Sequence, residues 1–187
     1  MEKKIIAKAE ASAIGGKPEV FAYYNKDESK KIAILSSKDR PQAGVITCAT
    51  IGLFDVDFGL TSENNNLRLE LIGSCDKAVE DFPNMIATAA FNFMESKKCS
   101  YGYAALNAIS EYITDTDMKH FYLMNPSLWE NLKTISVGET YITWLMCVPI
   151  SDAELNFLEK NGPDALEEEF EKKDIDIFNI YRKSIFN

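Results

Sequence analysis

The segment Val148-Pro149-Ile150-Ser151-Asp152-Ala153-Glu154-Leu155 joins an apolar run to the start of a helix. The run that leads into it, from Thr140 to Val148, is apolar and rich in residues that favour β structure, so it predicts a buried strand. Ser151 and Glu154 have the spacing of a capping box, in which the serine hydroxyl accepts from the amide three residues on and the glutamate reaches back. The chain is therefore expected to pass directly from a buried strand into a capped helix.

Two helices are expected after this junction. Asn161-Gly162 is typical of a helix end, and Pro163 is typical of the first position of the next helix. Leu166 and Phe170 form the apolar side of that second helix. Its opposite side is predicted to be a solvent-exposed acidic face made by Glu167, Glu168, Glu169 and Glu171.

Strand patterns dominate the first half of the chain. Val20–Tyr24 and Ile32–Leu35 flank a turn-like Asn25-Lys26-Asp27-Glu28 and predict a hairpin. Residues 44–53 are rich in β-branched side chains, and residues 67–72 alternate between leucine and charged side chains, so both predict strands. The polar, asparagine-rich stretch between them, residues 54–66, predicts a loop. Two amphipathic helices are expected at residues 2–13 and 79–95.

The order of these elements predicts an α+β fold in a single domain over residues 1–187. Strands cluster early and helices come late, which favours a mainly antiparallel or mixed sheet with helices packed on it and a helical C-terminal segment. Residues 103–113 and 119–124 are elements whose type the pattern does not decide.

Composition and charge limit the function classes. Of 187 residues, 46% are apolar, and 29 Asp and Glu outnumber 20 Lys and Arg, for a net charge of -9. Such a surface repels phosphate groups, so direct binding to nucleic acid or to an anionic membrane is not expected. The charge suits a basic protein partner, or it serves solubility alone.

Location and metal content are predicted from what the sequence lacks. It has no apolar run long enough for a signal peptide or a spanning helix, which predicts a cytoplasmic protein with reduced thiols. Four widely spaced cysteines and one histidine do not match the usual zinc ligand patterns, so neither a metal nor another cofactor is expected. Cys48 and Cys147 lie in apolar runs and are predicted to be core residues.

The search for catalytic residues yields one weak candidate. His120 has no recognisable nucleophile or orienting carboxylate in the sequence, so a structural or surface role is predicted. Asp55 and Asp57 lie on one side of any extended segment and could bind a cation or act as an acid–base pair. Paired carboxylates beside Phe54 and Phe58 more often mark a solvated strand end. No catalytic residue is therefore expected.

Several blocks of the sequence resemble the Suppressor of fused (SUFU-like) family in its compact bacterial form. One is the strand of residues 44–53, which ends in Thr50-Ile51-Gly52-Leu53. Others are the glutamate-bearing strand Leu69-Glu70-Leu71-Ile72, the Pro149–Glu154 junction and the terminal Arg182-Lys183-Ser184. The resemblance spans most of residues 20–185. It departs from the family at Phe54, where a serine is usual. Gly52 and Glu70 are predicted to be structural.

The resemblance implies an immunity or antitoxin protein, which neutralises a cognate bacterial toxin by binding it. Such toxins are often nucleases with a basic surface, and the acidic composition would complement one. The predicted partner-binding residues are Glu167, Glu168 and Glu171, with Asp55 and Asp57 as the second candidates. Two alternatives stay open: a small hydrolase-like enzyme that uses a carboxylate pair, and a scaffold that shields a peptide by strand addition.

Overall fold

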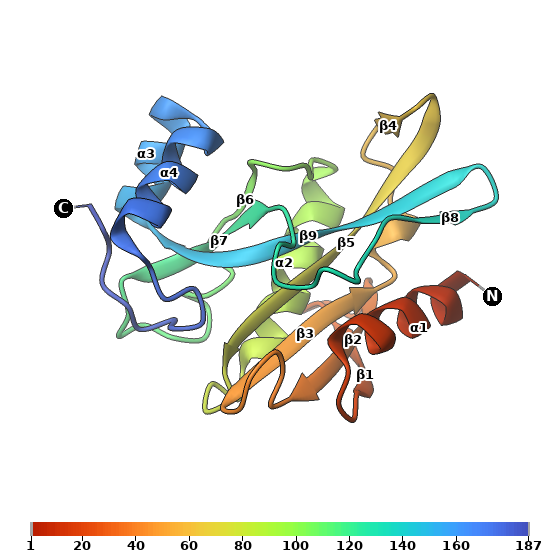
Figure 1. The fold of residues 1–187 in the computed structure, drawn as a ribbon, viewed down its shortest axis with the longest axis horizontal. Coiled ribbons are helices and arrows are strands. Elements are labelled where there is room, and N and C mark those ends of the chain that lie inside the picture. Colours follow the sequence, from red (N-terminus) through yellow and green to blue (C-terminus); the bar gives the residue numbers. More distant parts are fainter. Residues whose placement is uncertain (1, 187) are drawn as a thin grey trace.

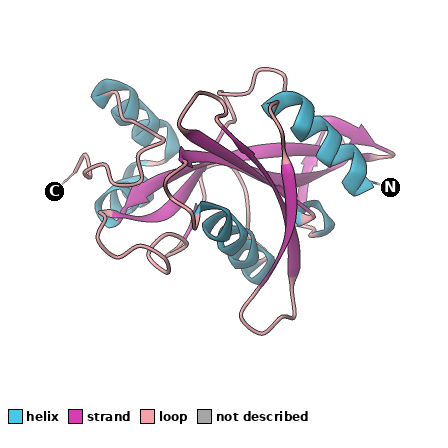
Figure 2. Cartoon of the chain, turned by 90° about the horizontal axis from the view of Figure 1, so that it is seen from below, coloured by secondary structure: helices cyan, strands magenta, loops and turns pink. Residues whose placement is uncertain are grey.

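A computed structural model describes residues 2–186 as a twisted sheet with helices on both faces (Figures 1 and 2). The helices are α1 (Glu2–Ile14), the 3-10 turn η1 (Leu53–Asp55), α2 (Phe82–Ser96), α3 (Asp152–Asn161) and α4 (Pro163–Lys173). The strands are β1 (Glu19–Tyr24), β2 (Lys31–Lys38), β3 (Val45–Ile51), β4 (Leu60–Ser62), β5 (Asn65–Asp76), β6 (Ala104–Ala105), β7 (Met118–Met124), β8 (Ile135–Val137) and β9 (Thr140–Ser151).

Within residues 2–186, all nine strands belong to one mixed sheet. Its main path runs β1-β2-β3-β5-β9-β7-β6, while β4 pairs with β5 and β8 pairs with β9. The pairs are antiparallel except for β5 and β9, which run parallel with Glu70 opposite Trp144. That parallel pair joins the strands of the first half of the chain to those of the second half. The predicted α+β class with a mixed sheet is confirmed.

Alternating side chains of the strands build a core on each face of the sheet. Leu69 and Leu71 of β5 belong to the layer that α2 covers, together with the α2 side chains Phe82, Met85 and Ile86. Ile72 of β5 and Trp144 of β9 belong to the opposite layer, which α1, α3 and α4 cover. Figure 2 shows α1 and α2 on opposite sides of the sheet. Burial of both faces explains why β9 is apolar almost throughout.

The strand-to-helix junction has the predicted geometry. The Glu154 amide donates to Ser151 Oγ at 3.1 Å, and the Ser151 amide donates to Glu154 Oε2 at 3.0 Å, which completes the capping box. Helix α3 ends before Gly162, and Pro163 begins α4, as expected. The predicted helices at 2–13 and 79–95 and the strands of the first half are also present.

The prediction of a continuous loop over residues 54–66 was wrong. This stretch contains η1 and the short strand β4, and β4 forms a hairpin with the beginning of β5. Glu63 and Asn64 make the turn with positive φ angles of 50° and 66°. Asparagine tolerates this left-handed conformation better than most residues, so the composition that resembles a loop marks a tight turn between strands.

The structure assigns the two regions whose type the sequence pattern did not decide, and it contains one strand that was not predicted. Residues 103–113 contain only the two-residue strand β6 between turns, whereas residues 118–124 form the buried strand β7. Strand β8 was not predicted, because three residues are too few for an alternation pattern to appear. No helix within residues 2–186 has the length and apolar character needed to cross a membrane.

Candidate partner-binding surfaces and buried carboxylates

The five predicted partner-binding carboxylates do not form one surface. Asp55 and Asp57 lie at and just after η1, whereas Glu167, Glu168 and Glu171 belong to α4. Figure 1 shows α4 and the β4–β5 hairpin next to η1 at opposite ends of the molecule. The sequence therefore predicted two separate acidic surfaces, and a partner would need to span the molecule to contact both.

Asp55 and Asp57 each pair with a cation of the chain itself. Lys3 Nζ lies 2.8 Å from Asp55 Oδ2, and about half of each side chain is exposed. Asp57 pairs with Arg68 and accepts from the Gly59 amide at 2.8 Å, and these contacts lower the pKa of the Asp57 carboxyl. Exposed ion pairs contribute little to stability. They do reduce the charge that these carboxylates present to a partner.

Only two of the three α4 glutamates face solvent as predicted. Glu168 and Glu171 are exposed, and Glu168 Oε2 lies 3.7 Å from Lys172 Nζ. Glu167 is partly buried and accepts a hydrogen bond of 2.6 Å from the hydroxyl of Tyr122. The expected outward orientation of Glu167 was wrong, because α4 turns this residue toward β7.

His120 is buried and both of its ring nitrogens are engaged. The Asn107 amide donates to Nδ1 at 2.8 Å, so Nδ1 acts as an acceptor. Nε2 lies 3.0 Å from Asp152 Oδ1 and is therefore the protonated nitrogen that donates to this carboxylate. A general base needs a free lone pair, and this arrangement leaves none. The geometry is that of a structural histidine that joins β7 to the start of α3.

The cysteines are buried and bear free thiols. Burial raises the pKa of Cys48, Cys75 and Cys99 to about 12, so these thiols stay protonated and unreactive at neutral pH. Among the described residues, no three His, Cys, Asp or Glu side chains come together in a way that could hold a metal ion.

Glu70 is fully buried and receives hydrogen bonds from the chain that follows β3. The amide of Gly52 donates to Oε1 at 2.7 Å, that of Leu53 to Oε2 at 3.2 Å and that of Phe54 to Oε1 at 3.4 Å. The hydroxyl of Thr50 also donates to Oε2. Gly52 reaches this geometry with a φ of 124°, where a side chain would be strained. Burial raises the pKa of Glu70 to about 7, and the four donors oppose that rise.

A second buried carboxylate is Glu10 of α1, which lies on the same face of the sheet as Glu70. Its Oε1 accepts from Trp144 Nε1 at 2.9 Å, and its Oε2 is buried without a partner. Burial raises the pKa of Glu10 well above the usual value, and the nearby Glu70 adds to the effect. Its surroundings therefore favour the neutral form of the Glu10 carboxyl. Because α1 covers Glu70, the charged face of β5 predicted from its alternation is an interior face.

Glu154 is the third buried carboxylate, and a cation neutralises it. Arg182 donates from Nη1 to Oε1 at 2.6 Å and from Nη2 to Oε2 at 2.8 Å, and Nη2 also donates to the Pro149 carbonyl at 2.8 Å. The amide of Ile185 donates to Oε1 at 3.0 Å. The capping-box glutamate thus anchors the segment that follows α4, a role that the helix-start pattern alone does not reveal.

The comparisons with known proteins settle the family. The family model described as Suppressor of fused protein (SUFU) matches residues 28–183, most of the chain. The chain belongs to the Suppressor of fused family. In the structure, the Thr-Ile-Gly-Leu step and the glutamate-bearing strand form the Glu70 site, and the Pro149–Glu154 junction forms the Glu154 site.

One curated relative covers the chain almost from end to end. Immunity protein YqcF of Bacillus subtilis (strain 168) is 39% identical over 186 residues, which span 98% of this chain and 97% of the relative. The two proteins are therefore alike along their whole shared length.

Solved structures show the same Suppressor of fused fold at low sequence identity. A SUFU homologue from Neisseria gonorrhoeae superposes with a TM-score of 0.73 at 13% identity and covers 97% of this chain and 95% of that one. A Sufu–Fu complex gives a TM-score of 0.66 at 13% identity, over 97% and 91% of the two chains. Drosophila Suppressor of Fused gives 0.64 at 10% identity, with 98% of this chain matching 50% of that one.

Proposed function

We propose that this protein is an immunity protein that binds a cognate bacterial toxin in the cytoplasm and neutralises it without catalysis. The observation that carries this proposal is the 39% identity to Immunity protein YqcF over nearly the full length of both chains. The engaged nitrogens of His120 and the ion-paired Asp55 and Asp57 also favour a binding role over acid–base catalysis.

A nuclease-type toxin with a basic surface is the proposed partner. The net charge of -9 favours association with a positively charged protein and disfavours binding of this chain to the toxin's nucleic-acid substrate. Inhibition would then follow from covering the toxin and would reach completion at one immunity protein for each toxin.

The proposal is tested by co-expression with the protein encoded beside this chain's gene. We expect the wild-type chain to rescue cells from that protein, to co-purify with it and to inhibit its nuclease activity stoichiometrically in vitro. The variants His120→Asn and Asp55→Asn/Asp57→Asn, checked for unchanged thermal unfolding, should rescue equally well. Loss of rescue in a stable variant that still binds the toxin would support the enzyme alternative, whereas loss of both rescue and binding in Asp55→Asn/Asp57→Asn would place these carboxylates in the interface. Failure of the wild-type chain would remove the immunity function.

The exposed glutamates of α4 are proposed to attract the toxin from a distance. Glu168→Lys/Glu171→Lys should slow association several-fold and weaken its salt dependence, because charge attraction mainly accelerates encounter. Glu130→Lys/Glu139→Lys makes the same change in net charge elsewhere and is the control. Association rates measured at two salt concentrations decide the matter, and equal rates for both variants would exclude α4 from this role.

Strand addition is a second candidate, and one observation favours it. Strand β1 lies at the edge of the sheet and exposes 50% of Val20, 57% of Phe21 and 53% of Tyr24. Exposed apolar edges can pair with an extended peptide, and a lysine on the edge prevents this. Phe21→Lys should abolish binding if β1 is the docking edge, and it should leave toxin binding intact if the acidic surfaces dock the partner.

A further inference from the structure

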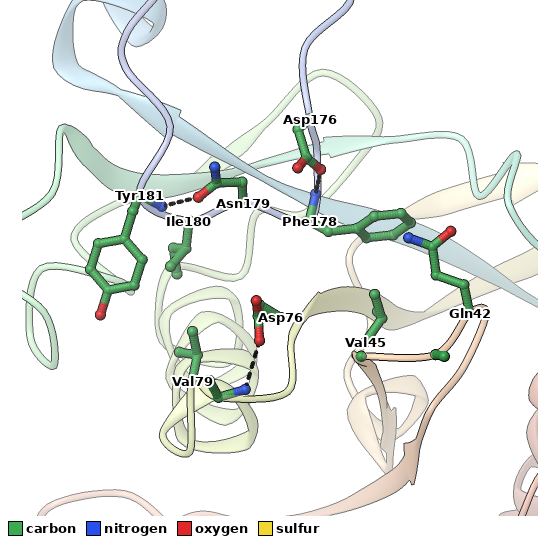
Figure 3. A pocket seen from close by; sticks show the side chains of 12 residues that line it. Gln42, Val45, Asp76, Val79, Asp176, Phe178, Asn179, Ile180 and Tyr181 are labelled. Carbon is green, nitrogen blue, oxygen red and sulfur yellow. Dashed lines mark hydrogen bonds between the residues drawn. The ribbon is translucent and has the colours of Figure 1, made fainter.

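Two neighbouring cavities share part of their lining close to the N-terminal end of α2. Their volumes are about 460 and 380 Å³, and both are lined by Ala78, Val79 and Tyr181. The first extends between the β2–β3 connection and residues 176–181, and the second extends toward residues 112–115. Figure 3 shows the first cavity with Asp76, Asp176 and the side chains around them. We call the combined hollow the acidic groove.

Hydrogen bonds hold the walls of the acidic groove in place. The Asp76 amide donates to the Phe178 carbonyl at 3.1 Å, which fastens the segment after α4 to the end of β5. The Thr116 hydroxyl donates to the Ile180 carbonyl at 2.5 Å on the other side. The Lys77 amide donates to the Gly44 carbonyl at 2.9 Å and fixes the third wall. A groove with fixed walls binds a partner at a lower entropic cost than a flexible one.

Carboxylates surround this groove. Asp76 and Asp176 each use one oxygen to accept from a backbone amide two residues on, at 2.8 and 3.0 Å, which leaves the second oxygen available. The described residues that line the two cavities include no lysine or arginine, and their acidic members are Asp76, Glu80, Asp81, Asp115 and Asp176. The neighbouring Lys77 is engaged, because its Nζ lies 2.8 Å from Asp39 Oδ1.

Apolar and aromatic groups line the groove between the carboxylates. Val79 and Ile180 are buried in its floor, and Phe178 is partly buried. Tyr181 and Tyr112 stand at its sides with 52% and 37% of their surface exposed. Aromatic rings accept the cationic groups of lysine and arginine on their faces, and apolar walls accept the methylene stems of these side chains. Tyrosine side chains are also typical of strong binding contacts.

We propose that the acidic groove receives a lysine- and arginine-bearing segment of the toxin that this protein neutralises. The inference rests on the proposed function and adds to it the contact that holds the complex together. Charge complementarity selects the occupant, since five carboxylates attract a basic segment and repel a phosphate backbone or an acidic peptide. The α4 glutamates accelerate encounter, whereas the groove slows dissociation by burying the basic side chains.

The test uses two groove variants and a matched control. Glu80→Lys/Asp115→Lys reverses two exposed charges whose side chains make none of the structure's hydrogen bonds or ion pairs among residues 2–186. Tyr181→Ala removes the exposed ring without changing charge, so it tests the groove even if the charge variant is unstable. Glu130→Lys/Glu139→Lys is the control, because it changes net charge by the same amount at exposed positions outside both the groove and α4.

The first measurement is independent of the toxin. The full-length chain, labelled with 15N, is titrated with the blocked peptide Lys-Arg-Lys-Arg-Lys and, separately, with its all-glutamate counterpart. We expect amide shifts centred on the groove with the basic peptide only. The apparent affinity should weaken at least about tenfold in Glu80→Lys/Asp115→Lys and stay at the wild-type value in Glu130→Lys/Glu139→Lys. Shifts that spread evenly over all acidic surfaces, or that persist in the groove variant, overturn the proposal.

The second measurement uses the neighbouring toxin in an inactivated form. Both groove variants should dissociate from it about tenfold faster than the wild-type chain, and Glu130→Lys/Glu139→Lys should dissociate at the wild-type rate. If both groove variants dissociate at the wild-type rate, the proposal that the groove binds the toxin is wrong, and the proposed immunity function still stands. If the wild-type chain does not bind the toxin at all, the proposed function fails, and the peptide titration still decides whether the groove binds basic segments.

Discussion

Glu70 and Glu154 are both completely buried, yet the chain satisfies them in opposite ways. Glu70 is held by three backbone amides and one hydroxyl, all from residues 50–54. Glu154 is held by the guanidinium of Arg182, which comes from a segment 28 residues later in the chain. The backbone donors around Glu70 fix the turn at residues 50–54 and supply no formal positive charge. Arg182 neutralises the charge of Glu154 and makes the segment around residue 182 part of the core.

The largest effect is expected when the cation of the second site is removed. Arg182→Met should destabilise the protein by about 3–5 kcal/mol, because it leaves the Glu154 carboxylate buried and unpaired. Lys183→Met removes the same charge from the adjacent, 87% exposed side chain and should change stability by less than about 0.5 kcal/mol. Urea unfolding of both variants measures the difference.

A double variant sharpens this prediction. Glutamine can replace glutamate in a capping box, so Glu154→Gln/Arg182→Met keeps the cap and removes both charges. It should be more stable than Arg182→Met alone, and the coupling energy of the double-mutant cycle gives the strength of the pair. A double variant less stable than Arg182→Met would show that the unpaired charge is not the source of the loss.

A smaller loss is expected at the backbone-held site. In Glu70→Gln, the side-chain NH2 group faces donors that the carboxylate satisfied, so one amide or hydroxyl loses its acceptor. The expected cost is about 1–3 kcal/mol. The midpoint of urea unfolding at pH 7 measures it. An unchanged midpoint would mean that Gly52, Leu53 and Phe54 do not depend on this carboxylate.

The pH dependence of stability should reveal the buried carboxyls whose pKa is raised in the folded protein. The pKa of Glu70 is raised to about 7 in the folded state, and that of Glu10 is also raised, so the folded chain binds more protons than the unfolded chain. The stability that Glu70 contributes is complete below pH 4.5 and is lost as pH rises through 7, and Glu10 acts in the same direction. Unfolding free energy should therefore fall between pH 5 and 8, and less steeply in Glu70→Gln. A slope identical to that of the wild type would refute the assignment.

The smallest effect is expected at Glu10. Because burial raises the pKa of Glu10 and favours its neutral form, Glu10→Gln keeps an oxygen for Trp144 Nε1 and resembles that form in charge. Stability at pH 6 should remain within about 0.5 kcal/mol of the wild type. Thermal unfolding compared with that of Glu70→Gln tests this. A loss as large as that of Glu70→Gln would mean that Glu10 is ionised in the folded protein.

Local patterns in the sequence predicted local structure well. The spacing of Ser151 and Glu154 gave the start of α3, and the alternation around Glu70 gave strand β5. The patterns could not reveal which helix covers which strand face, so they did not show that α1 buries Glu70. Nor could they pair Glu154 with Arg182 or Glu167 with Tyr122, since these partners lie 28 and 45 residues apart.

The same limit explains the candidate binding site. An acidic run on a predicted helix is visible in the sequence, so α4 was predicted. The acidic groove assembles its carboxylates from residues 76–81, from residue 115 and from residue 176, and the longest acidic run among them is the pair Glu80-Asp81. Tyr181 gave no signal either, because no pattern in the sequence places it beside Ala78 and Val79.

The parallel pairing of β5 with β9 also has a consequence for the growing polypeptide. Strands β1, β2, β3 and β5 have all been synthesised when the ribosome reaches Asp76. The parallel partner of β5 is β9, and its last paired residue, Cys147, is synthesised much later. Over that interval the nascent chain displays an unpaired and largely apolar strand edge, which is a template for aggregation. Slow translation between residues 77 and 140 would prolong this exposure, and a chaperone that covers β5 would relieve it.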